Sequence, residues 1–145
     1  MMVERRPVAW HWQRMPAVTL TQDPPVQNTW YTVLNTIRNV NIRSLALKQI
    51  NDEAAVKVVA WRVTLDGVAN TYAVNYNNNE KRFMFLRETS DTTYWTTITV
   101  PWAFGNFVTV FAKSAKVEIR ITDAPGTNPK LYAWVGYDQL KRVIK

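Results

Sequence analysis

The stretch Ala-Lys-Val-Glu-Ile-Arg-Ile-Thr, residues 115–122, carries the pattern that decides the fold class. Its apolar side chains, Ala115, Val117, Ile119 and Ile121, occupy every second position. Because successive side chains of a β-strand point to opposite faces, this alternation predicts a strand with one buried and one solvent-exposed face. The chain therefore contains at least one half-buried strand, which is typical of an antiparallel sheet.

A second alternating stretch ends in a hairpin signal. Apolar residues alternate from Val59 to Leu65, and Asp66-Gly67 follows directly. Glycine accepts a positive φ and aspartate tolerates one, so this dipeptide favours a tight turn between antiparallel strands. The return strand is expected over residues 70–76.

Further candidate strands follow at similar spacing. They are residues 29–34, 40–49, 82–87, 92–100, 106–112 and 130–137. The alternation slips within residues 40–49, and a β-bulge near Arg43 and Ser44 explains the slip. The competing interpretation is a short helix that begins at Ser44 and ends near Ala55.

This pattern predicts an all-β fold, an antiparallel β-sandwich of about eight strands with an extended N-terminal arm. A jelly roll matches the strand number best, an immunoglobulin-like sandwich is the second choice, and a closed barrel is the third. The expected organisation is an arm over residues 1–28, the sandwich over residues 29–138 and a short basic tail over residues 139–145. The last segment could also form a final edge strand.

The first 28 residues differ from the rest of the chain. They hold four of the seven prolines and the only histidine, His11. Dense prolines favour an extended path, and a disordered tail is usually poor in tryptophan. We therefore expect an arm that docks on a neighbouring subunit or on its own domain, with a mobile tail as the third choice. The candidate interface residues of the arm are Arg5, Arg6, Val8, Trp10, Trp12 and Arg14.

The composition argues against most enzyme chemistry. The chain has 145 residues, no cysteine, one histidine and four glycines. A cysteine nucleophile, the common Cys/His zinc sites and a glycine-rich phosphate loop are therefore excluded. No serine lies in a nucleophile elbow. We expect no enzyme activity, no catalytic or metal-binding residue and no cofactor.

The aromatic residues of the body suggest interaction surfaces. Two stretches are apolar on both faces, and an apolar outer face of a sandwich is a candidate interface. Its residues are Phe83, Phe85, Phe107 and Phe111. A carbohydrate-binding module is the alternative, because exposed aromatic rings stack on sugars. The candidate platforms for that role are Trp95, Trp102, Tyr132 and Trp134.

The net charge is +7, and the basic residues are dispersed along the chain. Basic and aromatic residues together suit single-stranded nucleic acid, so a nucleic-acid binder is a third and weaker hypothesis. Membrane contact is not expected, since no apolar run reaches about 18 residues.

The order of a basic arm rich in proline and tryptophan, a run of antiparallel strands and a basic end resembles small virion proteins of the β-sandwich or jelly-roll type. The stretches that carry this resemblance are residues 28–35, 41–50 and 63–67. The resemblance implies a minor capsid, decoration or turret protein of a phage or archaeal virus, located in the virion and assembled in the host cytoplasm. It also implies contacts with further copies and with other capsid proteins, a homo-oligomer such as a trimer or pentamer, and contact of the basic termini with packaged nucleic acid.

Overall fold

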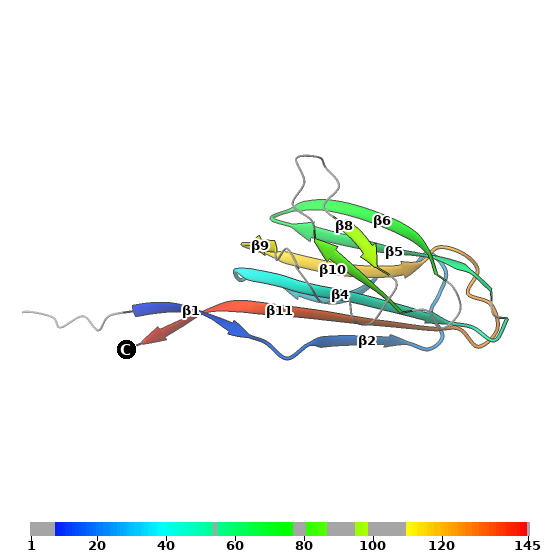
Figure 1. Cartoon of the computed structure of the whole chain (residues 1–145), viewed down its shortest axis with the longest axis horizontal. Helices are drawn as coiled ribbons and strands as arrows, with labels where there is room; N and C mark the ends of the chain where they lie inside the picture. The colour runs from blue at the N-terminus through cyan, green and yellow to red at the C-terminus, as the bar shows by residue number, and fades with distance from the viewer. Residues whose placement is uncertain (1–7, 54, 77–80, 87–94, 99–109, 145) are drawn as a thin grey trace, which may run out of the picture.

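The computed structural model describes residues 8–53, 55–76, 81–86, 95–98 and 110–144. These residues form eleven strands in two antiparallel sheets (Figure 1). The larger sheet contains β1 (Val8–Arg14), β2 (Val18–Gln22), β4 (Val40–Ile50), β7 (Lys81–Leu86), β8 (Trp95–Ile98), β9 (Val110–Ala112) and β11 (Lys130–Ile144). The smaller sheet contains β3 (Tyr31–Thr36), β5 (Lys57–Leu65), β6 (Val68–Tyr76) and β10 (Ala115–Ile121).

The strand order of the larger sheet is β1-β11-β4-β7-β8, with β2 also paired to β11 and β9 to β4. The smaller sheet has the order β3-β10-β5-β6. The chain passes between the sheets after β2, β3, β4, β6, β9 and β10, whereas β5 and β6 form a hairpin within one sheet. The predicted all-β sandwich is confirmed.

The core lies between the two inner faces. The four apolar residues of the opening stretch, Ala115, Val117, Ile119 and Ile121, are all buried. Trp61, on the neighbouring strand β5, is only 1% exposed and is among the largest buried side chains. The alternation in the sequence therefore identifies the inward face of β10 correctly.

Strand β4 contains the expected bulge. Gly136 of β11 pairs with Ser44, and the next residue, Tyr137, pairs with Ile42, so that Arg43 has no residue opposite it. The extra residue belongs to β4 alone, and the alternation along β11 is not interrupted. The helix that the sequence also allowed after Ser44 is not formed, because β4 continues to Ile50.

The turn between β5 and β6 is the predicted hairpin. Asp66 and Gly67 have φ angles of 50° and 84°. The Asp66 carboxylate accepts hydrogen bonds from the main-chain N–H groups of Lys113 (2.7 Å) and Ser114 (3.0 Å). The side chain therefore ties this hairpin to the turn between β9 and β10, which joins the two sheets.

The described part of the N-terminal arm forms strands on its own domain. β2 and β1 pair one after the other with the same edge of β11. Val18 and Leu20 of β2 pack against the core. Residues 8–22 are thus not a mobile tail, and residues 139–144 continue β11 instead of forming a separate basic tail.

We expect Asp66→Ala to lower the free energy of unfolding by about 2 kcal/mol, because two N–H groups lose a charged acceptor and alanine disfavours a positive φ. Urea unfolding measures this change. Asp66→Asn keeps an acceptor and tolerates the turn, so its loss should be smaller. Equal losses in the two variants would contradict the role given to the side chain.

Candidate functional site

A two-stranded ribbon extends beyond the sandwich. Val8 of β1 lies opposite Ile144 of β11, and the pairing continues to Arg14 and Asp138. Pairing between β11 and β4 stops at Gln139, so residues 140–144 have β1 as their strand partner in the described part of the chain. We call residues 8–12 and 140–144 the ribbon, and Figure 1 shows it projecting from one end of the molecule.

The ribbon presents an aromatic surface on the outer face of the larger sheet. Trp10 and Trp12 are two residues apart in β1, so both side chains lie on the same face. Their exposed fractions are 61% and 45%. Two large aromatic side chains exposed this far are an unusual surface for a soluble domain, because they keep apolar area in water. Docking of the arm on its own domain therefore does not bury these two tryptophans as a cap on the core.

Phe111 of β9 adds a third ring to this surface. Its centroid lies 5.1 Å from that of Trp12, in an edge-to-face arrangement, and the side chain is 61% exposed. Edge-to-face geometry is the arrangement that the charge distribution of aromatic rings favours. We call Trp10, Trp12 and Phe111 the aromatic stripe. The sequence placed Trp12 and Phe111 in two separate candidate interfaces, and the fold brings them into one.

Charged side chains hold the base of the ribbon. Asp138 lies 3.9 Å from Arg14 and 3.7 Å from Arg43, and it accepts a hydrogen bond of 3.4 Å from the Asn41 amide. These groups come from β1, β4 and β11. The bulge residue Arg43 therefore helps to fasten the arm to the sandwich.

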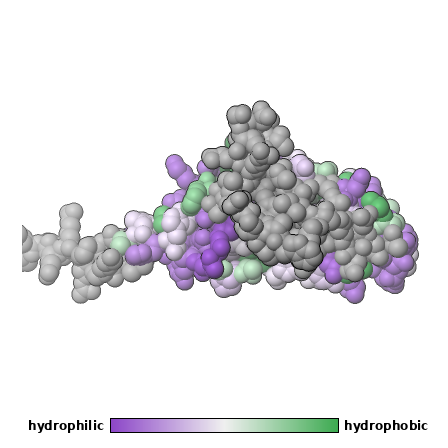
Figure 2. Space-filling model, viewed as in Figure 1, coloured by the Kyte–Doolittle hydropathy of each residue, from purple (hydrophilic) through white to green (hydrophobic). Residues whose placement is uncertain are grey.

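A hollow of about 550 Å³ lies where the ribbon leaves the body. We call it the ribbon hollow, and it is lined by Trp10, Ile37, Arg38, Asn39, Leu140, Lys141 and Arg142. A smaller hollow of about 320 Å³ lies beside Trp12 and Phe111, and Asn39 lines both. Figure 2 shows that hydrophilic residues dominate the described surface near the ribbon, with hydrophobic residues among them.

Sequence reasoning missed most of the ribbon hollow. Ile37, Arg38 and Asn39 lie in the turn between β3 and β4, and Leu140 lies in a segment that was expected to be a tail. The one local signal was the three positive charges in the last seven residues. The turn and the C-terminal segment meet only because β4 and β11 pair.

Tyr132 and Trp134, two of the candidate sugar-stacking residues, lie together on β11. Their rings are nearly parallel, at 19°, with centroids 6.2 Å apart. Leu131, Ala133 and Val135 are buried, so Tyr132 and Trp134 point to the outer face. They lie on the same face as the aromatic stripe, further along β11. Ala46 lies opposite Trp134 on the same outer face, yet it is only 5% exposed, so this part of the outer face is covered.

The outer face of the smaller sheet is occupied by a charged cluster. Arg62 donates two hydrogen bonds, of 2.9 and 2.8 Å, to the carboxylate of Glu118. The guanidinium groups of Arg62 and Arg120 lie 4.2 and 4.5 Å from the ring of Trp30. The hydrogen bonds from Arg62 lower the pKa of Glu118, although burial opposes this effect. These arginines are engaged within the fold, which weakens the case that they bind nucleic acid.

The other candidate residues are placed as follows. Arg5, Arg6, Phe107 and Trp102 lie outside the described residues. Val8 lies opposite Ile144. Phe83 lies opposite Ala46 in the sheet register, and Phe85 and Trp95 occupy β7 and β8. The side chains of these four residues lie outside the described part.

The described residues contain no group of three or more His, Asp or Glu side chains placed to hold a metal ion. No helix long and apolar enough to cross a bilayer occurs in the same ranges.

Similar proteins were found among solved structures. A chain of the Helicobacter pylori bacteriophage KHP30 capsid structure matches 94% of this chain over 100% of its own length, with 14% identity and a TM-score of 0.48. The structure of infectious bursal disease virus, Gt strain, matches 97% of this chain with 14% identity and a TM-score of 0.36. The VP2 subviral particle of infectious bursal disease virus matches 97% with 12% identity and a TM-score of 0.35.

This chain spans about a third of the length of the two bursal disease virus chains, 34% and 33%. The likeness to all three virus structures is a weak one, at the level of the fold. No protein-family model and no curated protein sequence matches the chain.

We expect Glu118→Gln to lower the free energy of unfolding by about 2 kcal/mol at pH 7, since two charge-assisted hydrogen bonds are weakened. The contribution of the carboxylate is complete above the unfolded-state pKa of about 4.3 and is lost as the pH falls through the lower folded-state pKa. Urea unfolding at several pH values should therefore show the two proteins converge in acid.

Lys116→Gln is the matched control for this experiment. Its ammonium group lies 3.8 Å from the same carboxylate, on a side chain that is 43% exposed. Because the lysine is partly exposed and makes a smaller contribution than Arg62, the control should lie much closer to the wild type than Glu118→Gln does at each pH. A gap between wild type and Glu118→Gln that stays constant down to pH 2 would contradict the assignment.

Proposed function

We propose that this chain is a non-enzymatic structural subunit of a virus particle, which assembles through its N-terminal segment and the outer face of its larger sheet. The observation that carries the assembly role is the aromatic stripe, in which Trp10, Trp12 and Phe111 are 61%, 45% and 61% exposed. Aromatic side chains dominate the free energy of many protein interfaces. The assignment to a virion follows the resemblance in organisation noted in the sequence.

The geometry suits contacts between neighbouring copies. Trp10 and Trp12 of the stripe lie on the ribbon, which projects from one end of the molecule (Figure 1), and in this proposal they dock on a different surface of the neighbouring copy. Contacts between unlike surfaces are heterologous, and they close into rings when the rotation allows. A trimer or pentamer is the closed ring that we favour, in contact with further capsid proteins.

Charge gives the arm a second role in this proposal. Arg14 is 74% exposed at its side chain, and Arg5 and Arg6 precede it in the sequence. These cations would face an acidic surface of a neighbouring subunit, or packaged nucleic acid if the arm lies on the inside of the particle. A specific role as a decoration or turret protein belongs to the same proposal.

A carbohydrate-binding role is the second candidate, and one observation favours it. Tyr132 and Trp134 form a nearly parallel pair on the outer face, with ring centroids 6.2 Å apart. A pair of rings in this arrangement offers a platform for a sugar ring. The aromatic stripe is then left without a role, which is why we prefer the structural proposal.

We expect the double variant Trp12→Ser, Phe111→Ser to weaken the self-association of the chain about thirtyfold or more, because interface aromatics commonly contribute about 1 kcal/mol or more each. Sedimentation velocity over a range of concentrations measures this change. The fold should survive, since both side chains are exposed. Deletion of residues 1–16 should likewise leave a folded monomer.

Val26→Ser is the matched control, because Val26 is 60% exposed and lies outside the stripe. It should associate like the wild type. A wild-type chain that is monomeric at all concentrations, or a double variant that associates normally, would overturn the proposal.

The carbohydrate role has its own test. Trp134→Ala should abolish binding on a glycan array if Tyr132 and Trp134 form a sugar platform, and it should leave self-association unchanged. We expect the array to show no binding that depends on Trp134. Such binding would replace the structural proposal by the carbohydrate-binding one.

A further inference from the structure

The ribbon has a free main-chain edge on the side of β4. The last strand pair between β11 and β4 joins Gln139 to Val40, and the N–H of Leu140 then donates a hydrogen bond of 3.0 Å to the carbonyl of Asn39. The chain turns away at this point, because β4 begins at Val40 and the preceding residues form the turn from β3. Beyond Leu140, no strand of the described residues lies on this side of β11.

The main-chain hydrogen bonds that β11 forms show in which direction its unpaired N–H and C=O groups point. In an antiparallel ladder, alternate residues exchange both main-chain hydrogen bonds with the same neighbour. Leu140 donates toward β4, so the N–H and C=O groups of Arg142 and Ile144 also point to this open side. The groups of Lys141 and Val143 point to β1, opposite His11 and Ala9. The ribbon therefore offers the donors and acceptors of a short unpaired strand.

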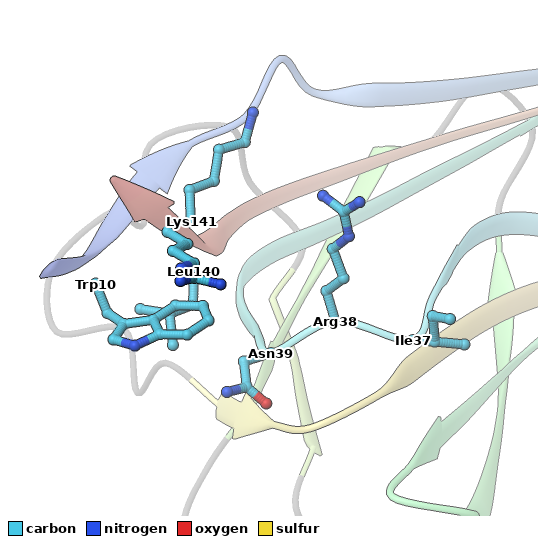
Figure 3. A pocket seen from close by; sticks show the side chains of 7 residues that line it. Trp10, Ile37, Arg38, Asn39, Leu140 and Lys141 are labelled. Carbon is cyan, nitrogen blue, oxygen red and sulfur yellow. The ribbon is translucent and has the colours of Figure 1, made fainter. Parts of the chain in front are cut away.

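The ribbon hollow lies directly beside this edge. Figure 3 shows Trp10 and Leu140 on the ribbon facing the turn that carries Ile37, Arg38 and Asn39. Ile37 is 90% exposed and Trp10 is 61% exposed. Apolar side chains thus flank the place where β4 would continue if it were longer, and a hollow of about 550 Å³ remains there. Side chains from an added strand would enter it.

The same hollow is strongly basic. Its lining includes Arg38, Lys141 and Arg142, and the seven described residues that line it include no carboxylate. In the described part of the chain, none of the three cations makes an ion pair. An occupant of this site would meet uncompensated positive charge, so a partner with negative side chains is favoured.

We propose that the free edge at residues 140–144 receives an extended, acidic peptide segment of a different protein. The segment adds to β11 as a strand, places apolar side chains in the hollow lined by Trp10, Ile37 and Leu140, and directs carboxylates to Arg142 and Lys141. The inference rests on the proposed function, because the segment would belong to another component of the assembly. The chain is then the acceptor at this edge, in addition to its contacts through the aromatic stripe.

Two other occupants fit less well. A second ribbon would bring Lys141 and Arg142 of another copy to the same edge, and like charges opposite each other destabilise a sheet. Nucleic acid would satisfy the cations, but its backbone cannot continue a ladder of alternating N–H and C=O groups. An acidic peptide satisfies the free edge, the apolar lining and the charge together.

The test uses the full chain and a fluorescein-labelled heptapeptide, Glu-Glu-Val-Val-Glu-Glu-Val, whose glutamates and valines occupy both faces of an extended strand. Binding is followed by fluorescence anisotropy. The peptide should bind and should weaken as salt is raised. A matched peptide with lysine in place of glutamate should not bind, and N-methylation of alternate amides should abolish binding by blocking the ladder.

Arg142→Pro is the sharpest variant. It removes an N–H group that points to the open side and leaves the groups that pair with β1 in place, and proline is tolerated at such edge positions. Binding should weaken about tenfold or more. Arg142→Glu keeps the N–H group and reverses the charge, and it should weaken binding to a similar or larger extent. Lys116→Glu, on the other sheet, should bind like the wild type.

The outcomes separate the possibilities. Failure of the acidic peptide to bind, or equal binding by Arg142→Pro and the wild type, overturns the acceptor edge. Displacement of the peptide by an oligothymidylate strand, with tight binding of that strand, would assign the site to nucleic acid. Self-association is measured separately in the stripe variants. A negative peptide result therefore overturns the acceptor edge and leaves the proposed function standing, and a negative self-association result overturns the proposed function and leaves the peptide result standing.

Discussion

The main-chain hydrogen bonding of β11 is the interaction on which the rest of the larger sheet depends. This strand runs for 15 residues, from Lys130 to Ile144. It pairs with β4 on one side and with β2 and then β1 on the other. Without it, the N-terminal segment would have no strand partner among the described residues, and the ribbon, the aromatic stripe and the hollow would not exist.

The ribbon joins the two ends of the described chain, since Val8 lies opposite Ile144. Closing a loop of this length costs conformational entropy before the pairing returns any stability. The β5–β6 hairpin costs much less conformational entropy to close, because only Asp66 and Gly67 join its two strands. Trp10 and Trp12 of the ribbon are also far more exposed than the side chains of the core. The surface that we assign to assembly thus belongs to the part of the fold that is held by main-chain pairing and the Asp138 cluster, and not by burial.

Local patterns in the sequence predicted local structure well, and they failed where a distant partner decides the outcome. The alternation at residues 115–122, the turn at Asp66 and the phase slip at Arg43 each lie within a few residues, and all three predictions are confirmed. Glu118 occupies an outward position of β10 and was expected to be solvated, yet it is buried beneath Arg62 of another strand. The ribbon hollow was not predictable for the same reason, because Ile37 and Leu140 meet only through strand pairing.

The bulge in β4 has a consequence for how this fold tolerates change. Because the extra residue, Arg43, belongs to β4, β11 keeps one uninterrupted two-residue phase from Leu131 to its end. Tyr132, Trp134, Leu140 and Arg142 consequently share a face, although the first two lie over the sandwich and the last two on the ribbon. Deletion of Tyr137, the one residue between Gly136 and Asp138, would remove a single side chain and turn the ribbon over relative to the body. The number of residues in this segment of β11, more than their identity, therefore decides which face of the ribbon lies on the same side as the outer face of the sandwich.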